Sequence, residues 1–226
     1  MTYNNIHRGV FLSRPNRFIA HVEIDGREEL VHVKNTGRCR ELLVPGAEVY
    51  VDKADNPNRS TKYDLVTVRK GGRLINMDSQ APNKVFLEHL REGKYIEGIT
   101  LIKPEAKYGS SRFDFYAEAG GRKIFIEVKG VTLEENNAVL FPDAPTERGV
   151  RHIHELIRCV SEGYEAHAVF VVQMEGAAYF TPNNKTHPAF GEALRAAQAA
   201  GVKIAALDCC VSQNSLTIRQ PVPIKL

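Results

Sequence analysis

The pattern of apolar residues changes near Asp78, and this change constrains the fold more than any other feature of the chain. Before it, from Arg8 to about Met77, short alternating or β-branched runs are separated by turn residues: VFLS, RFIAHVEI, ELVHVK, AEVYV, YDLVTV and RLIN. Such runs are typical of strands, and Asp25-Gly26 between the second and third runs favours a tight hairpin. This first part of the chain is therefore predicted to be all-β.

After Asp78 the pattern is that of alternating helices and strands. A helix is expected near residues 83–91, followed by strands and then by a β-α-β-α-β alternation that ends at Asp208. A second helix is expected from about Thr146 to Gly163, with an apolar face made of Val150, Ile153, Ile157 and Val160. A third helix is expected to begin at Pro188 and to end at Gly201.

Two domains follow from this change of pattern. About five strands within roughly seventy residues suit a compact barrel of the OB type, a fold that often binds oligonucleotides or oligosaccharides. We therefore predict an α/β protein with an all-β module: an OB-fold-like domain in residues 1–81 and an α/β domain in residues 82–226.

The charge of the chain is unevenly divided between these two parts. Residues 1–81 hold 13 Lys and Arg against 10 Asp and Glu, whereas residues 82–226 hold 17 of each kind. A mildly basic first domain suits an anionic partner. The N-terminus lacks the features of a signal peptide, and no later stretch is apolar for long enough to span a bilayer. We expect a cytoplasmic protein without a membrane partner, and its four cysteines, which show no CxxC spacing, are expected to be reduced.

Residues 111–130 carry the pattern that points to chemistry: two strand-like runs joined at Gly120-Gly121. A two-residue hairpin turn there pairs Asp114 with Glu127, so that the two acids face each other. Strand alternation then places Lys129 on the same face as these acids. A three-residue turn would change this pairing, although Glu127 and Lys129 would still share a face.

Like charges directly opposite each other destabilise a sheet, so the predicted pair needs a compensating cation. Lys129 or Arg112 partly supplies it, and a divalent metal supplies it better. Two carboxylates form a hard oxygen site of the kind that Mg²⁺ (or Mn²⁺) favours, and such a metal binds phosphate and lowers the pKa of an attacking water. The alternative is an ordinary solvated strand face, on which alternating Glu and Lys are common.

Four stretches of the chain resemble the sugar fermentation stimulation protein family: NTGRCRELLVPGAEVYV at 35–51, SRFDF at 111–115, IEVKGVTL at 126–133 and FPDAPTERGVRHIHEL at 141–156. The resemblance covers essentially the whole chain. It implies an OB-like barrel, a second domain related to the PD-(D/E)xK nucleases with a mixed sheet, DNA binding with little sequence preference, and a link to the regulation of sugar use, including maltose.

The resemblance also implies roles for individual residues. The two acids of the nuclease motif fall on Asp114 and Glu127, its lysine falls on Lys129, and the Val128 carbonyl is a further metal ligand. The chain departs from the motif at Phe113, which stands where the motif has a proline. Because the proline performs no chemistry, this departure leaves the assigned roles in place.

Several basic residues are candidates for contacts with DNA. Arg148 and His152 are expected on the face of their helix opposite the apolar face, where they reach phosphate, although an ordinary wet helix face has the same pattern. The remaining candidates flank the strands of the barrel or begin the hairpin: Arg14, Arg17, Lys34, Arg38, Arg40 and Arg112. Scattered surface arginines are the alternative explanation for each of them.

These observations support three hypotheses. The first is a DNA-binding protein of little sequence specificity that hydrolyses phosphodiesters with a divalent metal. The second keeps DNA binding and drops catalysis, which gives a non-enzymatic regulator of sugar (maltose) metabolism. The third is a saccharide-binding barrel. The chain has no GxGxxG or Walker loop, so no nucleotide cofactor is expected. The oligomeric state, including a homodimer, stays open.

Overall fold

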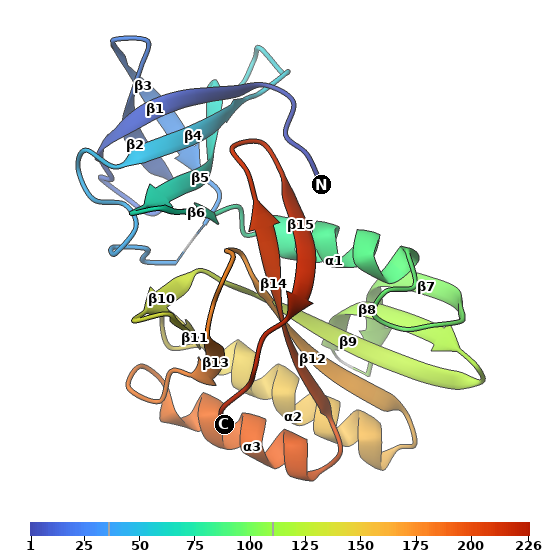
Figure 1. Cartoon of the computed structure of the whole chain (residues 1–226). Coiled ribbons are helices and arrows are strands. Elements are labelled where there is room, and N and C mark those ends of the chain that lie inside the picture. Colours follow the sequence, from blue (N-terminus) through green and yellow to red (C-terminus); the bar gives the residue numbers. More distant parts are fainter. Residues whose placement is uncertain (36, 110) are drawn as a thin grey trace.

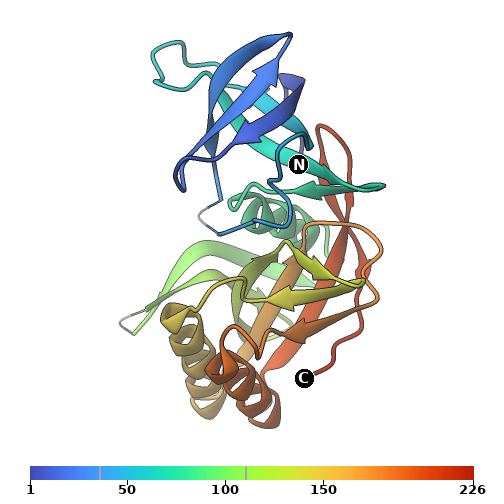
Figure 2. The same cartoon turned by 90° about the vertical axis from the view of Figure 1, so that its left-hand side faces the viewer.

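The computed structural model describes residues 1–35, 37–109 and 111–226. A small barrel stands on a larger second domain, and the strand pair β14 and β15 rises from the second domain beside the barrel (Figure 1). The same stacking is visible from the side, where helices lie at the base of the molecule (Figure 2). In the part of the chain that is described, no helix is long and apolar enough to cross a membrane.

The first domain is a barrel closed by five strands, with a sixth added at the edge. Its strands are β1 (Ile6–Ser13), β2 (Ile19–Ile24), β3 (Arg27–Val33), β4 (Glu48–Lys53), β5 (Tyr63–Lys70) and β6 (Arg73–Asn76). They follow the order β3-β2-β1-β4-β5-β6, and a parallel pairing of β3 with β5 closes the barrel. Asp25 and Gly26 both have positive φ in the turn between β2 and β3, as the predicted hairpin requires.

The second domain is built on a mixed six-stranded sheet of order β15-β14-β12-β9-β8-β7, in which β9, β12 and β14 are parallel. Its elements are α1 (Ala81–Arg91), β7 (Ile99–Tyr108), β8 (Ser111–Ala119), β9 (Arg122–Val131), β10 (Leu133–Glu135), β11 (Ala138–Phe141), α2 (Glu147–Ser161), β12 (Glu165–Val172), β13 (Tyr179–Pro182), α3 (Pro188–Ala199), β14 (Lys203–Val211) and β15 (Leu216–Pro221). Helix α1 covers one face of the sheet, and α2 and α3 cover the other (Figures 1 and 2). The predicted fold class is confirmed.

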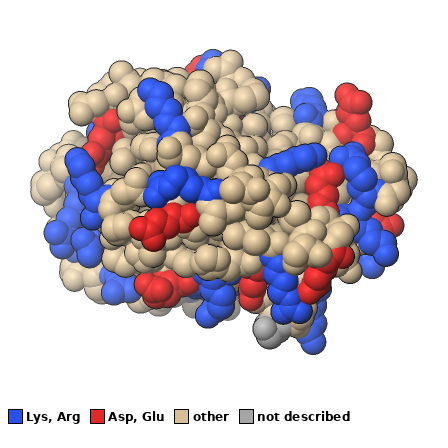
Figure 3. Space-filling model, turned by 90° about the horizontal axis from the view of Figure 1, so that it is seen from below, with Lys and Arg blue, Asp and Glu red and all other residues tan. Residues whose placement is uncertain are grey.

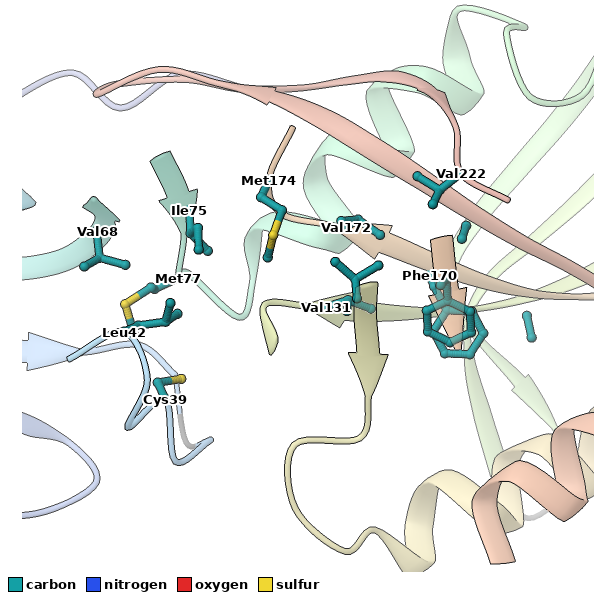
Figure 4. Close-up of a cluster of buried hydrophobic side chains, with 14 of the residues drawn as sticks. Cys39, Leu42, Val68, Ile75, Met77, Val131, Phe170, Val172, Met174 and Val222 are labelled. Carbon is teal, nitrogen blue, oxygen red and sulfur yellow. The ribbon is translucent and has the colours of Figure 1, made fainter. Parts of the chain in front are cut away.

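The apolar core runs without interruption from the barrel into the second domain. Leu42 and Met77 of the barrel belong to the same buried cluster as Val131 and Met174 (Figure 4). A second cluster of buried apolar residues fills the space between α1 and the face of the sheet that α1 covers. Because the core is shared, the position of the barrel relative to the sheet is fixed by packing.

The helices lie close to their predicted positions, and one small sheet was not predicted. Thr146 is the N-cap of α2, and its hydroxyl accepts a hydrogen bond from the Gly149 N–H. Helix α1 begins at Ala81, two residues before the predicted start. The additional sheet has the order β10-β11-β13, and its strands are only three or four residues long.

Candidate metal centre

The hairpin of β8 and β9 has the predicted register. Tyr116 pairs with Phe125, and Phe115 pairs with Ile126, which is the last described pair of this ladder. Gly120 and Gly121 both have positive φ, as a two-residue type I′ turn requires. The two-residue alternative is therefore confirmed, and the three-residue turn is wrong.

Strict alternation, in contrast, is wrong at the end of β8 that carries Asp114. It would place Phe113 with Phe115 on the face that α1 covers, yet the Phe113 ring lies 5.5 Å from the ring of Phe125, on the opposite face. On the neighbouring strand, Glu105 has φ 55°, which is in the left-handed region. The strands are thus irregular where they pass Asp114.

This irregularity lets the Asp114 carboxylate bind the backbone of β9. Its Oδ2 accepts a hydrogen bond from the Val128 N–H at 2.7 Å, and its Oδ1 accepts one from Asn83 Nδ2 of α1, also at 2.7 Å. Asn83 is a residue of the candidate site that the sequence did not predict. Its only sequence signal is its place one residue after Pro82, in the first turn of a helix.

Among the described residues, one carboxylate oxygen of Glu127 has hydrogen-bond partners and the other has none. It is 3% exposed, and its Oε1 accepts hydrogen bonds from Lys129 Nζ and from His152. Among the described residues its Oε2, which is also buried, has no hydrogen-bond partner. A buried carboxylate oxygen without a partner is costly, so this oxygen is suited to a ligand that replaces water.

His152 lies elsewhere than predicted. Its side chain is buried on Glu127, although the helix pattern placed it on the wet face of α2. The guanidinium of Arg148 donates a hydrogen bond from Nε to His152 Nε2 at 3.4 Å. In this arrangement the N–H of the imidazole is at Nδ1, which donates a hydrogen bond to Glu127 Oε1. His152 therefore orients the carboxylate, and the exposed Arg148 orients His152.

The pKa values of the two acids are shifted in opposite directions. Burial raises the pKa of Asp114, and the neighbouring charge of Glu127 raises it further. Burial also acts to raise the pKa of Glu127, but the hydrogen bond with His152 and the charge of Lys129 outweigh it and lower that pKa. Both hydrogen-bond donors to Asp114 are neutral groups, so Lys129 is the one permanent cation among the described side chains that hydrogen-bond to the pair.

The site fits a small divalent cation in its donor chemistry. It offers two carboxylates, and among the described residues one carboxylate oxygen has no partner. Carboxylates are hard donors of the kind that Mg²⁺ and Ca²⁺ take. No group of three His, Cys, Asp or Glu side chains suited to a metal occurs within the described ranges. Water or phosphate oxygens would therefore complete the coordination, as is usual for Mg²⁺. The role of the Val128 carbonyl as a ligand stays a prediction.

Close packing fixes the strand that carries these residues. A Cβ atom at Gly130 would lie 2.6 Å from Gln173 Oε1 and 2.7 Å from Pro82 Cγ, so only glycine fits. Gln173 in turn donates to Asn76 Oδ1 at 2.9 Å and to the Asp78 carbonyl at 3.0 Å. The Gln173 N–H also donates to the Val131 carbonyl at 2.9 Å, so Gln173 joins β9 to the segment that leaves the barrel.

The predicted DNA-binding residues fall into two groups. Four line one cavity of about 770 Å³ at the base of the barrel: Arg14, Arg17, Arg38 and Arg40. Lys34 and Arg112 do not line this cavity. Lys34 lies 3.4 Å from Asp64 and 3.5 Å from Asp78, and Arg112 pairs with Glu105 at 3.1 Å.

The surface over α2 and α3 differs from the arginine-lined cavity. Basic and acidic side chains are interspersed on this face of the molecule (Figure 3). Mixed charges of this kind give no field of a single sign, whereas a surface that tracks a phosphate backbone carries mostly cations. The arginines of the barrel are therefore the better candidates for DNA contacts.

Comparison with known proteins agrees with both parts of the fold. Residues 12–77 match the family model described as the SfsA N-terminal OB domain, and residues 80–215 match the sugar fermentation stimulation protein RE domain. A sugar fermentation stimulation protein homolog of Desulfitobacterium hafniense is 62% identical over 226 residues, covering 100% of this chain and 99% of the relative. A homolog of Clostridium beijerinckii is 58% identical, covering 100% of both chains.

A solved structure is similar over the same length. The structure of Pyrococcus furiosus SfsA in complex with Ca²⁺ has a TM-score of 0.90 and 31% sequence identity, covering 100% of this chain and 98% of that one. Both domains, the curated relatives and this structure agree. The chain therefore belongs to the sugar fermentation stimulation protein family.

Proposed function

We propose that this protein binds DNA with little sequence specificity and that its second domain hydrolyses phosphodiesters with a divalent metal, Mg²⁺ or Mn²⁺. The observation that carries the proposal is the pair formed by the half-buried Asp114 and the buried Glu127. The pair is short of positive charge, and among the described residues one oxygen of Glu127 has no hydrogen-bond partner. The relative from Pyrococcus furiosus supports it, since its structure contains Ca²⁺, a cation that takes the same oxygen ligands.

The residues around the pair have separate tasks in this mechanism. Asp114 and Glu127 would hold the metal, which would act as a Lewis acid and lower the pKa of an attacking water. Asn83 fixes the carboxylate of Asp114, and His152 fixes that of Glu127. Lys129, whose ammonium group lies on Glu127, stabilises the negative charge that develops on the phosphate.

DNA binding in this proposal rests on the arginines of the barrel. Arg17, Arg38 and Arg40 are exposed and line one cavity together with Arg14. Contacts between arginine and phosphate release counterions, so retention on DNA is expected to fall steeply as the salt concentration rises. Such contacts carry no sequence information, which accounts for the low specificity.

One experiment tests the catalytic part. Purified protein is incubated with single-stranded, duplex and branched DNA in Mg²⁺ or Mn²⁺, beside the variants Asp114→Ala and Glu127→Ala. Glu118→Ala is the matched control, because this carboxylate lies on the same hairpin and binds the Tyr116 hydroxyl. We expect cleavage by the parent protein and the control, and none by the two site variants.

The possible results separate the hypotheses. Cleavage that survives both site substitutions would show that the reaction occurs elsewhere. If no substrate is cleaved in either metal while DNA is still bound, the proposal fails in favour of a non-enzymatic DNA-binding regulator of sugar metabolism, including maltose. Absence of DNA binding at low salt would remove both.

A further inference from the structure

The cavity at the base of the barrel has the charge of a polyanion site. It is lined by four arginines, and among the residues that the structure describes no Asp or Glu lines it. Arg17, Arg38 and Arg40 take part in none of the described ion pairs, whereas most other arginines of the barrel are paired, such as Arg69 with Glu48 at 2.7 Å. Three guanidinium groups are thus available to a ligand.

Arg14 has a different task, because it holds the cavity together. Its Nη1 donates to the carbonyls of Gly37 and Arg38 at 3.0 and 2.9 Å, and its Nη2 donates to those of Arg17 and Asn35, both at 2.7 Å. These bonds tie the segment before β2 to the segment after β3. A preformed cavity loses less conformational entropy when it binds a ligand.

Exposed apolar side chains flank these arginines. Phe18 directly follows Arg17 and is 56% exposed, and Val44, between two residues that line the cavity, is 49% exposed. The Phe18 N–H donates to Asn16 Oδ1, and Asn16 also lines the cavity. An exposed aromatic ring beside unpaired arginines is the combination on which unpaired bases stack.

The cavity is physically connected to the metal centre. Ala144 and Pro145 of the second domain contribute to its lining, and the Arg38 N–H donates to Asp143 Oδ2 at 3.1 Å. A side chain at Gly37 would overlap Asp143, so the barrel segment and residues 143–145 pack closely. The chain then continues into α2, whose His152 binds Glu127.

We propose that this cavity and the Phe18 ring bind an unpaired, single-stranded segment of DNA, with phosphates at the arginines and a base stacked on Phe18. In duplex DNA the base faces are stacked on one another, so they are not accessible to Phe18. The inference rests on the proposed function in one respect: it assigns single-stranded or branched DNA as the substrate that the barrel presents to the metal centre.

The test measures binding by the full-length protein in Ca²⁺, using the fluorescence anisotropy of a labelled oligothymidine and of a duplex of equal length. Phe18→Ala is expected to weaken single-strand binding on the order of 10-fold and to leave duplex binding unchanged, because one stacked base is lost. Phe18→Tyr should retain the parent affinity. Val10→Ala is the control, since this exposed side chain lies between Glu23 and Glu48 on the barrel.

The outcomes distinguish this inference from the proposed function. Unchanged single-strand binding by Phe18→Ala, or an equal loss for the duplex, would overturn the single-strand site whether or not DNA is cleaved. A selective loss in Phe18→Ala would support the site even if no metal produced cleavage, in which case only the hydrolytic part of the proposed function would fail.

Discussion

The barrel and the second domain each bury a carboxylate, but they neutralise it to different extents. In the barrel, Asp64 accepts hydrogen bonds from Arg59 at 2.6 and 3.0 Å, lies 2.9 Å from His32 Nδ1 and lies 3.4 Å from Lys34. Burial opposes ionisation of Asp64, but the hydrogen bonds from Arg59 and His32 outweigh it and lower the pKa to about 2. The charge is fully matched within the domain.

In the second domain two carboxylates share less positive charge. The described donors to Asp114, the Asn83 amide and the Val128 N–H, are neutral, and Lys129 and His152 both bind the same oxygen of Glu127. As a result the pKa of Asp114 is raised, and Glu127 Oε2 has no partner among the residues described. Asp64 is therefore neutralised by groups of its own domain, whereas the second-domain pair would gain from the cation that we propose it binds.

The largest effect that this comparison predicts is for Asp64→Asn. The substitution leaves Arg59 and its neighbours without their counter-charge, so we expect the free energy of unfolding at pH 7 to fall by about 3 kcal/mol. The folded-state pKa is lowered, so the contribution of Asp64 is present above the ordinary Asp pKa and is lost as the pH falls toward about 2. Urea unfolding between pH 7 and pH 2 measures both effects.

The matched variant in the second domain is expected to act in the opposite direction. Because the pKa of Asp114 is raised in the folded protein, protonation of Asp114 favours folding. This contribution to stability is complete below the ordinary Asp pKa and is lost as the pH rises, so at neutral pH the ionised side chain destabilises the metal-free protein. Asp114→Asn in a chelator should therefore raise the free energy of unfolding. If both variants lost stability equally, the proposed difference between the domains would be wrong.

The second prediction concerns the cation that we propose for this pair. A metal that binds the folded state and not the unfolded state stabilises a protein by about 2.7 kcal/mol when the free metal concentration is a hundredfold above its Kd. Titration of Mn²⁺ or Mg²⁺ followed by thermal unfolding should show this increase for the parent protein and for Asp64→Asn. Asp114→Asn should show none. A metal-dependent increase that persists in Asp114→Asn would place the bound ion elsewhere.

Local sequence patterns predicted the fold class and the hairpin, because the interactions that decide them are local. The Gly120-Gly121 turn fixes the register of β8 against β9 without help from the rest of the chain. The small sheet of β10, β11 and β13 was missed for the opposite reason. Its strands are too short to show an alternation of apolar and polar residues. In addition, β11 pairs with β13, and the whole of α2 and β12 separates these two strands in the sequence.

The sequence placed Asp114, Glu127 and Lys129 close together, as they lie in the structure, but it predicted their geometry only in part. Alternation fails at Phe113 because the neighbouring strand is irregular at Glu105, which no pattern within β8 reveals. His152 is buried because Glu127, from a distant strand, satisfies its ring, whereas helix periodicity treats histidine as polar and exposed. Asn83 was missed since its role depends on contact with Asp114. All three depend on tertiary contacts.

The third prediction tests whether the surroundings of Asp114 matter for metal binding. Asn83→Ala removes the side chain that fixes the Asp114 carboxylate, and loss of such an orienting partner weakens metal affinity by about 10-fold or more. Isothermal titration with Mn²⁺ measures the change. Lys84→Ala, an exposed neighbour on α1, is the control and should bind as the parent does. Equal affinity for all three proteins would mean that Asp114 needs no support from α1.

The smallest expected effect separates paired from unpaired arginines on the barrel. Arg17 has no acidic partner among the described residues, so we expect it to contact a phosphate and Arg17→Ala to reduce the salt slope of DNA binding by about 1. Arg69 is already neutralised by Glu48 at 2.7 Å, so Arg69→Ala should leave the slope unchanged. Affinities for a labelled oligonucleotide at several salt concentrations give both slopes. A slope that falls equally in both variants would mean that DNA contacts the whole barrel surface, because binding would then be indifferent to whether an arginine already has an internal partner.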